Sequence, residues 1–115
     1  MDERVRDRLE HILTAIAAIE RYSSGRDEND FIDDPMLIDA VERNIERISE
    51  ASRHLPDDLK AAYPQVPWRE IAGIGNVLRH DYPQVRPKEI WETVVGDLPP
   101  LKDTIVAMLR GEQAG

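Results

Sequence analysis

The chain has 115 residues, no cysteine and a formal net charge of −8, with 33% charged residues. The lack of cysteine excludes disulfides, thiolate metal sites and thiol nucleophiles. The negative charge argues against broad, non-specific nucleic-acid binding, which depends on releasing counterions from phosphates. No apolar run approaches the roughly 18 residues of a membrane span, and the N-terminus is charged. We therefore expect a cytoplasmic protein with no membrane contact.

The first long segment, residues 2–22, carries apolar residues at helical spacing. They step by four and three residues, which predicts one continuous amphipathic helix. We expect Asp2 to be its N-cap and the Ser-Ser-Gly run at 23–25 to end it. The apolar positions are Val5, Leu9, Ile12, Ile16 and Ile19.

An acidic connector, residues 26–34, leads to a second helix that ends near residue 54. Phe31, the only phenylalanine, is expected to close one end of the bundle. Asp33 or Asp34 can cap the second helix, whose first turn accommodates Pro35. Its inward residues are expected to be Ile38, Val41, Ile45 and Ile48.

Positive charge is unevenly distributed along the chain. Arg43 and Arg47 flank the apolar seam of the second helix, where they face either solvent or a site. Residues 64–88 carry four basic residues against two acidic ones, although the whole chain is strongly acidic. This pattern indicates either ordinary variation in a charged surface or a locally basic cleft.

Shorter segments follow the second helix. Asp57 and Asp58 are candidate caps for a short turn. A helical segment begins at Pro87, and a last helix is expected to start after Asp97 and to end at Gly111. The inward residues of these later segments are Ile90, Val94, Leu98, Leu101, Ile105 and Met108.

No segment alternates like a strand, so the predicted fold class is all-α. We expect an antiparallel bundle of four to five helices joined by short connections. The bundle should form a single domain over residues 1–111, followed by a frayed tail at 112–115.

The central helix, predicted over residues 67–82, carries the most informative pattern. Ile71, Ile74 and Leu78 form its packing face, whereas Arg69, Gly73, Asn76 and His80 gather on the opposite side. Gly73 and Gly75 each cost about 1 kcal/mol relative to alanine in a helix. Close approach of a second helix, from this chain or from another copy, would compensate for that cost.

The end of the central helix brings together residues capable of chemistry. His80 carries an imidazole, the side chain best suited to act as a general acid or base at neutral pH. Asn76, one turn earlier, can orient the imidazole or bind a phosphate oxygen. Tyr82 offers a phenol that can donate a hydrogen bond or accept a modifying group, and Asp81 can steady the histidine. Spacing alone also fits a histidine that is structural or merely exposed.

The stretch PWREIAGIGNVLRHDYPQV, with the later IWETVVGDLPPL, resembles the HepT-like family of the HEPN superfamily over essentially the whole chain. The family's R-x4-H-x-Y signature resembles the site of a metal-independent ribonuclease that serves as a toxin. The resemblance implies a HEPN-like helical bundle that dimerises with its motif helices facing each other across a cleft. It also implies a partner, a minimal nucleotidyltransferase antitoxin that adds AMP to the motif tyrosine.

Three motif residues carry over from the family, and one does not. The family histidine matches His80, the tyrosine matches Tyr82, and the amide matches Asn76, whereas Gly75 stands where the family has arginine. Losing a cation that stabilises developing charge commonly costs about a hundred- to a thousandfold in rate. Arg79, one turn later, is the best substitute. The other candidates, from either subunit, are Arg43, Arg47 and Arg69.

Three functions follow as hypotheses. The first is an RNA-cleaving toxin in which His80 is the acid or base, Asn76 positions phosphate, Arg79 supplies the cation and Tyr82 accepts AMP; it implies no metal and no cofactor. The second is a non-catalytic HEPN dimer that docks the nucleotidyltransferase and has lost nuclease activity with the arginine. The third is a structural or adaptor bundle without a nucleic-acid role.

Overall fold

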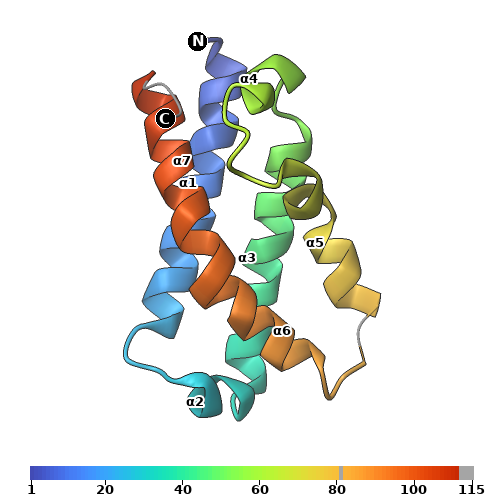
Figure 1. The fold of residues 1–115 in the computed structure, drawn as a ribbon. Coiled ribbons are helices and arrows are strands. Elements are labelled where there is room, and N and C mark those ends of the chain that lie inside the picture. The colour runs from blue at the N-terminus through green and yellow to red at the C-terminus, as the bar shows by residue number, and fades with distance from the viewer. Residues whose placement is uncertain (81, 112–115) are drawn as a thin grey trace.

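The computed structural model describes residues 1–80 and 82–111, and within them every regular element is helical (Figure 1). The all-α prediction is confirmed for this part of the chain. The frayed tail predicted at 112–115 and the role suggested for Asp81 lie outside the described residues. The elements are α1 (Glu3–Ser23), α2 (Glu28–Ile32), α3 (Pro35–Arg53), α4 (Asp57–Ala61), α5 (Trp68–His80), α6 (Arg86–Glu92), the π-helical turn η1 (Thr93–Asp97) and α7 (Leu98–Arg110).

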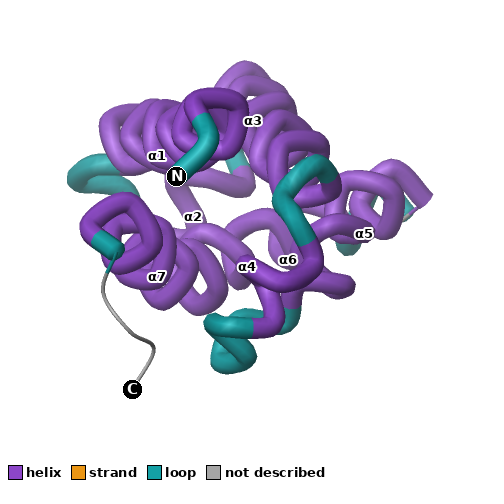
Figure 2. Tube along the Cα trace, turned by 90° about the horizontal axis from the view of Figure 1, so that it is seen from above, coloured by secondary structure: helices purple, strands orange, loops and turns teal. Residues whose placement is uncertain are grey.

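Helix α3 lies at the centre of the bundle (Figures 1 and 2). It packs against α1 on one side and against α5 on the other, and α1 also packs against α7. Successive long helices run in opposite directions, as the sequence predicts. Helix α5 lies at the edge, where its main contacts are with α3 and α6. None of the helices in the described ranges has the length and apolarity that crossing a membrane requires.

The core consists of the aliphatic seams expected from the sequence. Burying one such side chain contributes roughly 1.5–3 kcal/mol, so the α1–α3–α7 seams dominate the stability of the bundle. Val5 lies at the edge of the core and is only partly buried. The seam residues with at most 1% exposure are Leu9, Ile12, Ile16, Ile19, Val41, Ile45, Ile48, Ile90, Leu101, Ile105 and Met108.

The ends of the long helices follow the predicted capping residues. The Asp2 side chain accepts a hydrogen bond from the Arg4 amide at 2.7 Å. Asp34 accepts one from the Leu37 amide at 3.1 Å, and Pro35 occupies the first turn of α3. Each cap satisfies a backbone donor that the first turn of a helix leaves unpaired.

Helix α2 was not predicted, because the acidic composition of residues 26–34 suggested a connector. A capping box forms this helix: the Asp27 side chain accepts from the Asp30 amide at 2.9 Å, and the Asp30 side chain accepts from the Asp27 amide at 3.1 Å. Phe31 is fully buried, and its ring lies 5.3 Å from that of Trp91. Phe31 therefore joins α2 to α6 at one end of the bundle.

One predicted helix cap differs from the structure. Pro56 is the N-cap of α4, which has no side-chain cap, so Asp57 and Asp58 lie inside the helix instead of capping it. The last helix, α7, starts at Leu98, directly after Asp97, as predicted. Asp97 makes no capping hydrogen bond, because the backbone is already helical there and continues from α6 through η1 into α7. Gly111 ends α7 in the left-handed region, with φ +70°, as predicted.

The contact between α5 and α3 depends on Gly75. A Cβ atom at this position would lie 3.4 Å from Glu46 Cγ and 3.6 Å from Glu46 Cα. Ser49, buried on α3, donates a hydrogen bond to the carbonyl of Ile71 at 2.9 Å. The helix approaching Gly75 is thus α3 of the same chain. A Cβ on Gly73 would meet no described atom within 4 Å.

We predict that Gly73→Ala raises the free energy of unfolding by about 1 kcal/mol, because alanine favours helix and the added methyl has open space. Gly75→Ala should gain less, since its Cβ must fit against Glu46. Urea denaturation of both variants measures the difference. A loss of stability in Gly73→Ala would contradict the prediction.

Candidate functional site

The outer face of α5 presents the polar residues of the motif to solvent. Ile71 and Leu78 are buried against the rest of the bundle, and Asn76, Arg79 and His80 are exposed. This division follows from the helical period, since residues on the packing side recur every three or four positions. His80 is the last residue of α5. Its ring is therefore neither enclosed among aliphatic side chains nor covered by another helix of this chain.

Tyr82 lies between α5 and α6 with a fixed backbone and an exposed side chain. Its carbonyl oxygen accepts hydrogen bonds from the amides of Val85 at 2.9 Å and Arg86 at 3.0 Å. The residue as a whole is 77% exposed. Its phenol is therefore accessible to a partner, while its main chain helps to start α6.

A charged pair anchors the segment that follows Tyr82. Arg86 Nε, at the start of α6, lies 3.4 Å from Glu42 Oε2 of α3. Burial raises the pKa of the Glu42 carboxyl, and the nearby Arg86 guanidinium partly opposes that shift. This pair holds α6 against α3.

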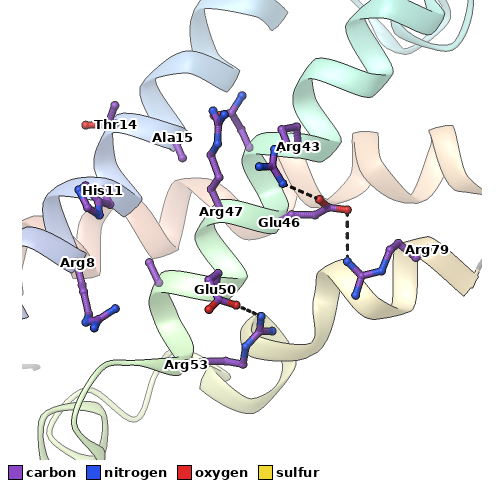
Figure 3. A pocket seen from close by; sticks show the side chains of 12 residues that line it. Arg8, His11, Thr14, Ala15, Arg43, Glu46, Arg47, Glu50, Arg53 and Arg79 are labelled. Atoms are coloured by element: carbon purple, nitrogen blue, oxygen red, sulfur yellow. Dashed lines mark hydrogen bonds and ion pairs between the residues drawn. The ribbon is translucent and has the colours of Figure 1, made fainter.

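Arg79 points from α5 towards α3 and meets a carboxylate there (Figure 3). Its Nη1 lies 3.5 Å from Glu46 Oε1, and its Nη2 lies 3.5 Å from Asn76 Oδ1. Glu46 also pairs with Arg43 at 3.5 Å. A single glutamate thus holds guanidinium groups from two helices.

Gly75 and Arg79 are adjacent on the same side of α5. A Cβ at position 75 would lie against Glu46, and Arg79 reaches the same glutamate from one turn further along. The guanidinium of Arg79, one turn after the motif glycine, is therefore engaged by Glu46. Among the predicted arginines, Arg79 is the one in direct contact with another motif residue, Asn76.

A cavity of about 510 Å³ opens between α1, α3 and α5 (Figure 3). We call it the arginine cavity, because five of the residues that line it are arginines. Glu46 and Glu50 are its acidic residues, and Glu50 also pairs with Arg53 and, at 3.0 Å, with His54. Its arginine and histidine residues are Arg8, His11, Arg43, Arg47, Arg53 and Arg79.

The structure brings together part of the predicted set. Arg43, Arg47 and Arg79 line the arginine cavity, whereas Arg69 lies exposed in the first turn of α5, away from it. His80 is outside the lining of the cavity and next to Arg79 in sequence. Among the described residues, no group of three or more His, Cys, Asp or Glu side chains is arranged to hold a metal ion.

Sequence reasoning missed Arg8, His11 and Arg53. The period of the first helix alone assigns Arg8 and His11 to no site, because the pairing of α1 with α3 that brings them to the cavity is a tertiary contact. A partial signal existed on α3, where charged residues recur at helical spacing: Arg43, Arg47, Glu50 and Arg53.

The all-helical bundle with an exposed histidine and tyrosine at the end of one helix is the architecture expected of a HEPN-like protein. The sequence model of the family described as "Ribonuclease HepT-like" matches residues 12–108. The chain belongs to this HepT-like ribonuclease family.

Several proteins of known sequence resemble the chain. It is 36% identical over 105 residues to a candidate RNase of Caldanaerobacter subterraneus subsp. tengcongensis, covering 91% of this chain and 94% of that protein. It is 40% identical over 97 residues to a probable ribonuclease HepT of Thermococcus cleftensis, covering 84% and 88%. A Methanocaldococcus jannaschii protein named as a gamma-glutamylcyclotransferase and candidate RNase is 38% identical over 110 residues, which are 96% of this chain and 50% of that longer protein. No solved structure matches the chain with significance.

The burial of the Glu42 carboxyl makes the stability of the fold depend on pH. Because the folded state raises the pKa of Glu42 above 4.5, this group's contribution to stability falls as pH rises from about 4.5 towards its folded pKa. Glutamine does not titrate, so the stability of Glu42→Gln relative to the native protein should increase over that interval. Urea denaturation between pH 4 and pH 7 measures the difference.

Glu50→Gln is the control of opposite sign. The hydrogen bond with His54 and the neighbouring Arg53 lower the pKa of Glu50, so the native carboxylate is stabilising above pH 4.5 and loses that effect as pH falls. The relative stability of Glu50→Gln should therefore decrease as pH rises. If the relative stabilities of both variants changed in the same direction with pH, the opposite pKa shifts assigned to Glu42 and Glu50 would be wrong.

Proposed function

We propose that this chain is the toxin component of a type VII-like toxin–antitoxin pair, an endoribonuclease that acts in the cytoplasm. A minimal nucleotidyltransferase antitoxin would neutralise it by transferring AMP to Tyr82. The observation that carries the proposal is the exposed end of α5, where His80 and Tyr82 are both open to solvent beside Arg79. Membership of the HepT-like ribonuclease family supports the reaction class.

In the proposed reaction, a ribose 2′-hydroxyl attacks the adjacent phosphorus and loses its proton to a base. The bond from phosphorus to the 5′-oxygen breaks, and that oxygen takes up a proton from an acid. An imidazole with a pKa near neutrality can serve in either role. Asn76 would donate a hydrogen bond to a phosphate oxygen, and Arg79 would offset the charge that builds on it. The reaction written in this way requires neither a metal nor a cofactor.

A homodimer would supply two imidazoles to one cleft. Helix α5 lies at the edge of the bundle, and its outer face carries Val77, which is 59% exposed, between Asn76 and His80. A second copy of α5 placed across this face would bury Val77 and bring the two His80 rings towards each other. One ring would act as the base and the other as the acid.

The alternative is a non-catalytic dimer that still docks the nucleotidyltransferase. One observation favours it: Arg79, the best substitute for the missing motif arginine, is paired with Glu46 and directed towards α3. If the phosphate cannot draw Arg79 away from Glu46, the site lacks its cation.

The first test is RNA cleavage in the presence of a chelator. We expect the native protein to cut RNA and His80→Ala to lose about a hundredfold or more of the rate, because general acid–base catalysis commonly contributes that much. His54→Ala is the matched control, since His54 is also exposed but lies at the C-cap of α3, where it pairs with Glu50. Equal, negligible cleavage by the native protein and by His80→Ala would favour the non-catalytic alternative.

The second test is modification by the partner enzyme. In the proposed transfer, the Tyr82 phenol attacks the α-phosphorus of ATP, loses its proton and releases pyrophosphate. After incubation with the nucleotidyltransferase and ATP, mass spectrometry should show AMP on the native protein and on Tyr22→Phe, a control at another exposed tyrosine. Tyr82→Phe should stay unmodified. An increment that persists in Tyr82→Phe would remove Tyr82 from this role.

A further inference from the structure

The arginine cavity is a positive site in an acidic protein. Five arginines and two glutamates line it, an excess of three positive charges, whereas the whole chain has a formal net charge of −8. Like charges that converge without counterions repel one another. A cavity of this composition therefore favours a negatively charged occupant.

Two of the arginines have no carboxylate partner in the described part of the chain. Arg43, Arg53 and Arg79 pair with the cavity glutamates. Arg8, by contrast, makes no ion pair or hydrogen bond through its side chain within residues 1–80 and 82–111, and the hydrogen bond of Arg47 is to an amide. These two guanidinium groups come from α1 and α3 and border the same space.

A buried amide holds Arg47 in place. Asn44 is only 5% exposed, and its Nδ2 donates to the Ala40 carbonyl at 2.9 Å. That bond fixes the amide so that Oδ1 accepts from Arg47 Nη1 at 3.3 Å. Ala15, opposite on α1, is small enough to leave room for the arginine side chain (Figure 3). The guanidinium is thus oriented into the cavity by groups buried in the fold.

We propose that the arginine cavity binds the phosphate backbone of an RNA strand next to the proposed cleft, with Arg8 and Arg47 as its main contacts. This inference rests on the proposed function, because it extends the RNA path away from His80. The cavity begins at Arg79, the residue before His80, and follows α3 from Arg43 to Arg53, a distance of about 15 Å at the rise of an α-helix. That length accommodates more than one phosphate.

The lining favours backbone contact over base recognition. Among the described residues that border the cavity, the sole ring is the imidazole of His11. Proteins that bind single strands through bases present aromatic side chains for stacking, and this cavity offers arginines instead. Arginine binds phosphate in a bidentate manner and carries no sequence information when it does so.

Binding of an uncleavable RNA tests the inference separately from cleavage. The probe is a fluorescent single-stranded oligonucleotide with 2′-O-methyl riboses, which lacks the attacking hydroxyl, and the readout is anisotropy at several salt concentrations. Arg8→Gln/Arg47→Gln should weaken binding about tenfold and reduce the salt slope by roughly 1.4, as expected for two lost phosphate contacts on a single strand. The control Arg4→Gln/Arg6→Gln removes the same charge from exposed positions outside the cavity and should change affinity less than about twofold.

Arg8→Lys/Arg47→Lys keeps the charge and should keep the salt slope, and thermal unfolding by circular dichroism verifies that each variant folds. Equal effects of the two glutamine double variants, or no effect of either, would overturn the inference. So would a loss of partner binding or self-association with unchanged RNA affinity, because the cavity would then receive a protein. If the native protein binds the probe through Arg8 and Arg47 but does not cleave RNA, the nuclease proposal fails and the cavity assignment stands.

Discussion

The close contact between α5 and α3 is the constraint on which the candidate site depends. Gly75 removes the side chain that would separate the helices at Glu46, and the Ser49 hydroxyl binds the Ile71 carbonyl across the same contact. With α5 held in this way, its packing face is buried within the chain, and its outer face stays accessible to other molecules. The same proximity places Arg79 against Glu46, so the position of this guanidinium is a consequence of the packing.

Much of the fold is predictable, because local rules govern most of it. Helical spacing locates the long helices, and the Asp2 and Asp34 caps mark two of their starts. Helix α2 was missed because its capping box, built from Asp27 and Asp30, lies in a run so acidic that composition suggested a loop. The start of the last helix after Asp97 was predicted from the proline pair that follows, whereas the π turn through which the backbone enters α7 without a break was not.

The candidate site likewise has one part that the sequence predicts and one part that only tertiary packing creates. The exposure of Asn76 and His80 follows from the period of a single helix, and the sequence was sufficient to predict it. The arginine cavity needs three helices at once, so Arg8 and His11 join it only through the packing of α1 on α3. Arg69 shows that lying on the motif helix does not by itself place a residue at the site. It belongs to the motif helix, yet a full helix length separates it from the end where His80 lies.

The backbone of Tyr82 takes part in the fold through hydrogen bonds, whereas its side chain is exposed. The carbonyl supports the first turn of α6, which Glu42 and Arg86 tie to the middle of the bundle, while the ring extends into solvent. A group attached to the phenolic oxygen would alter the outer contour and charge of the molecule without disturbing its core. Control at this residue would therefore work by obstruction, and removing the obstacle would restore the original surface with no refolding.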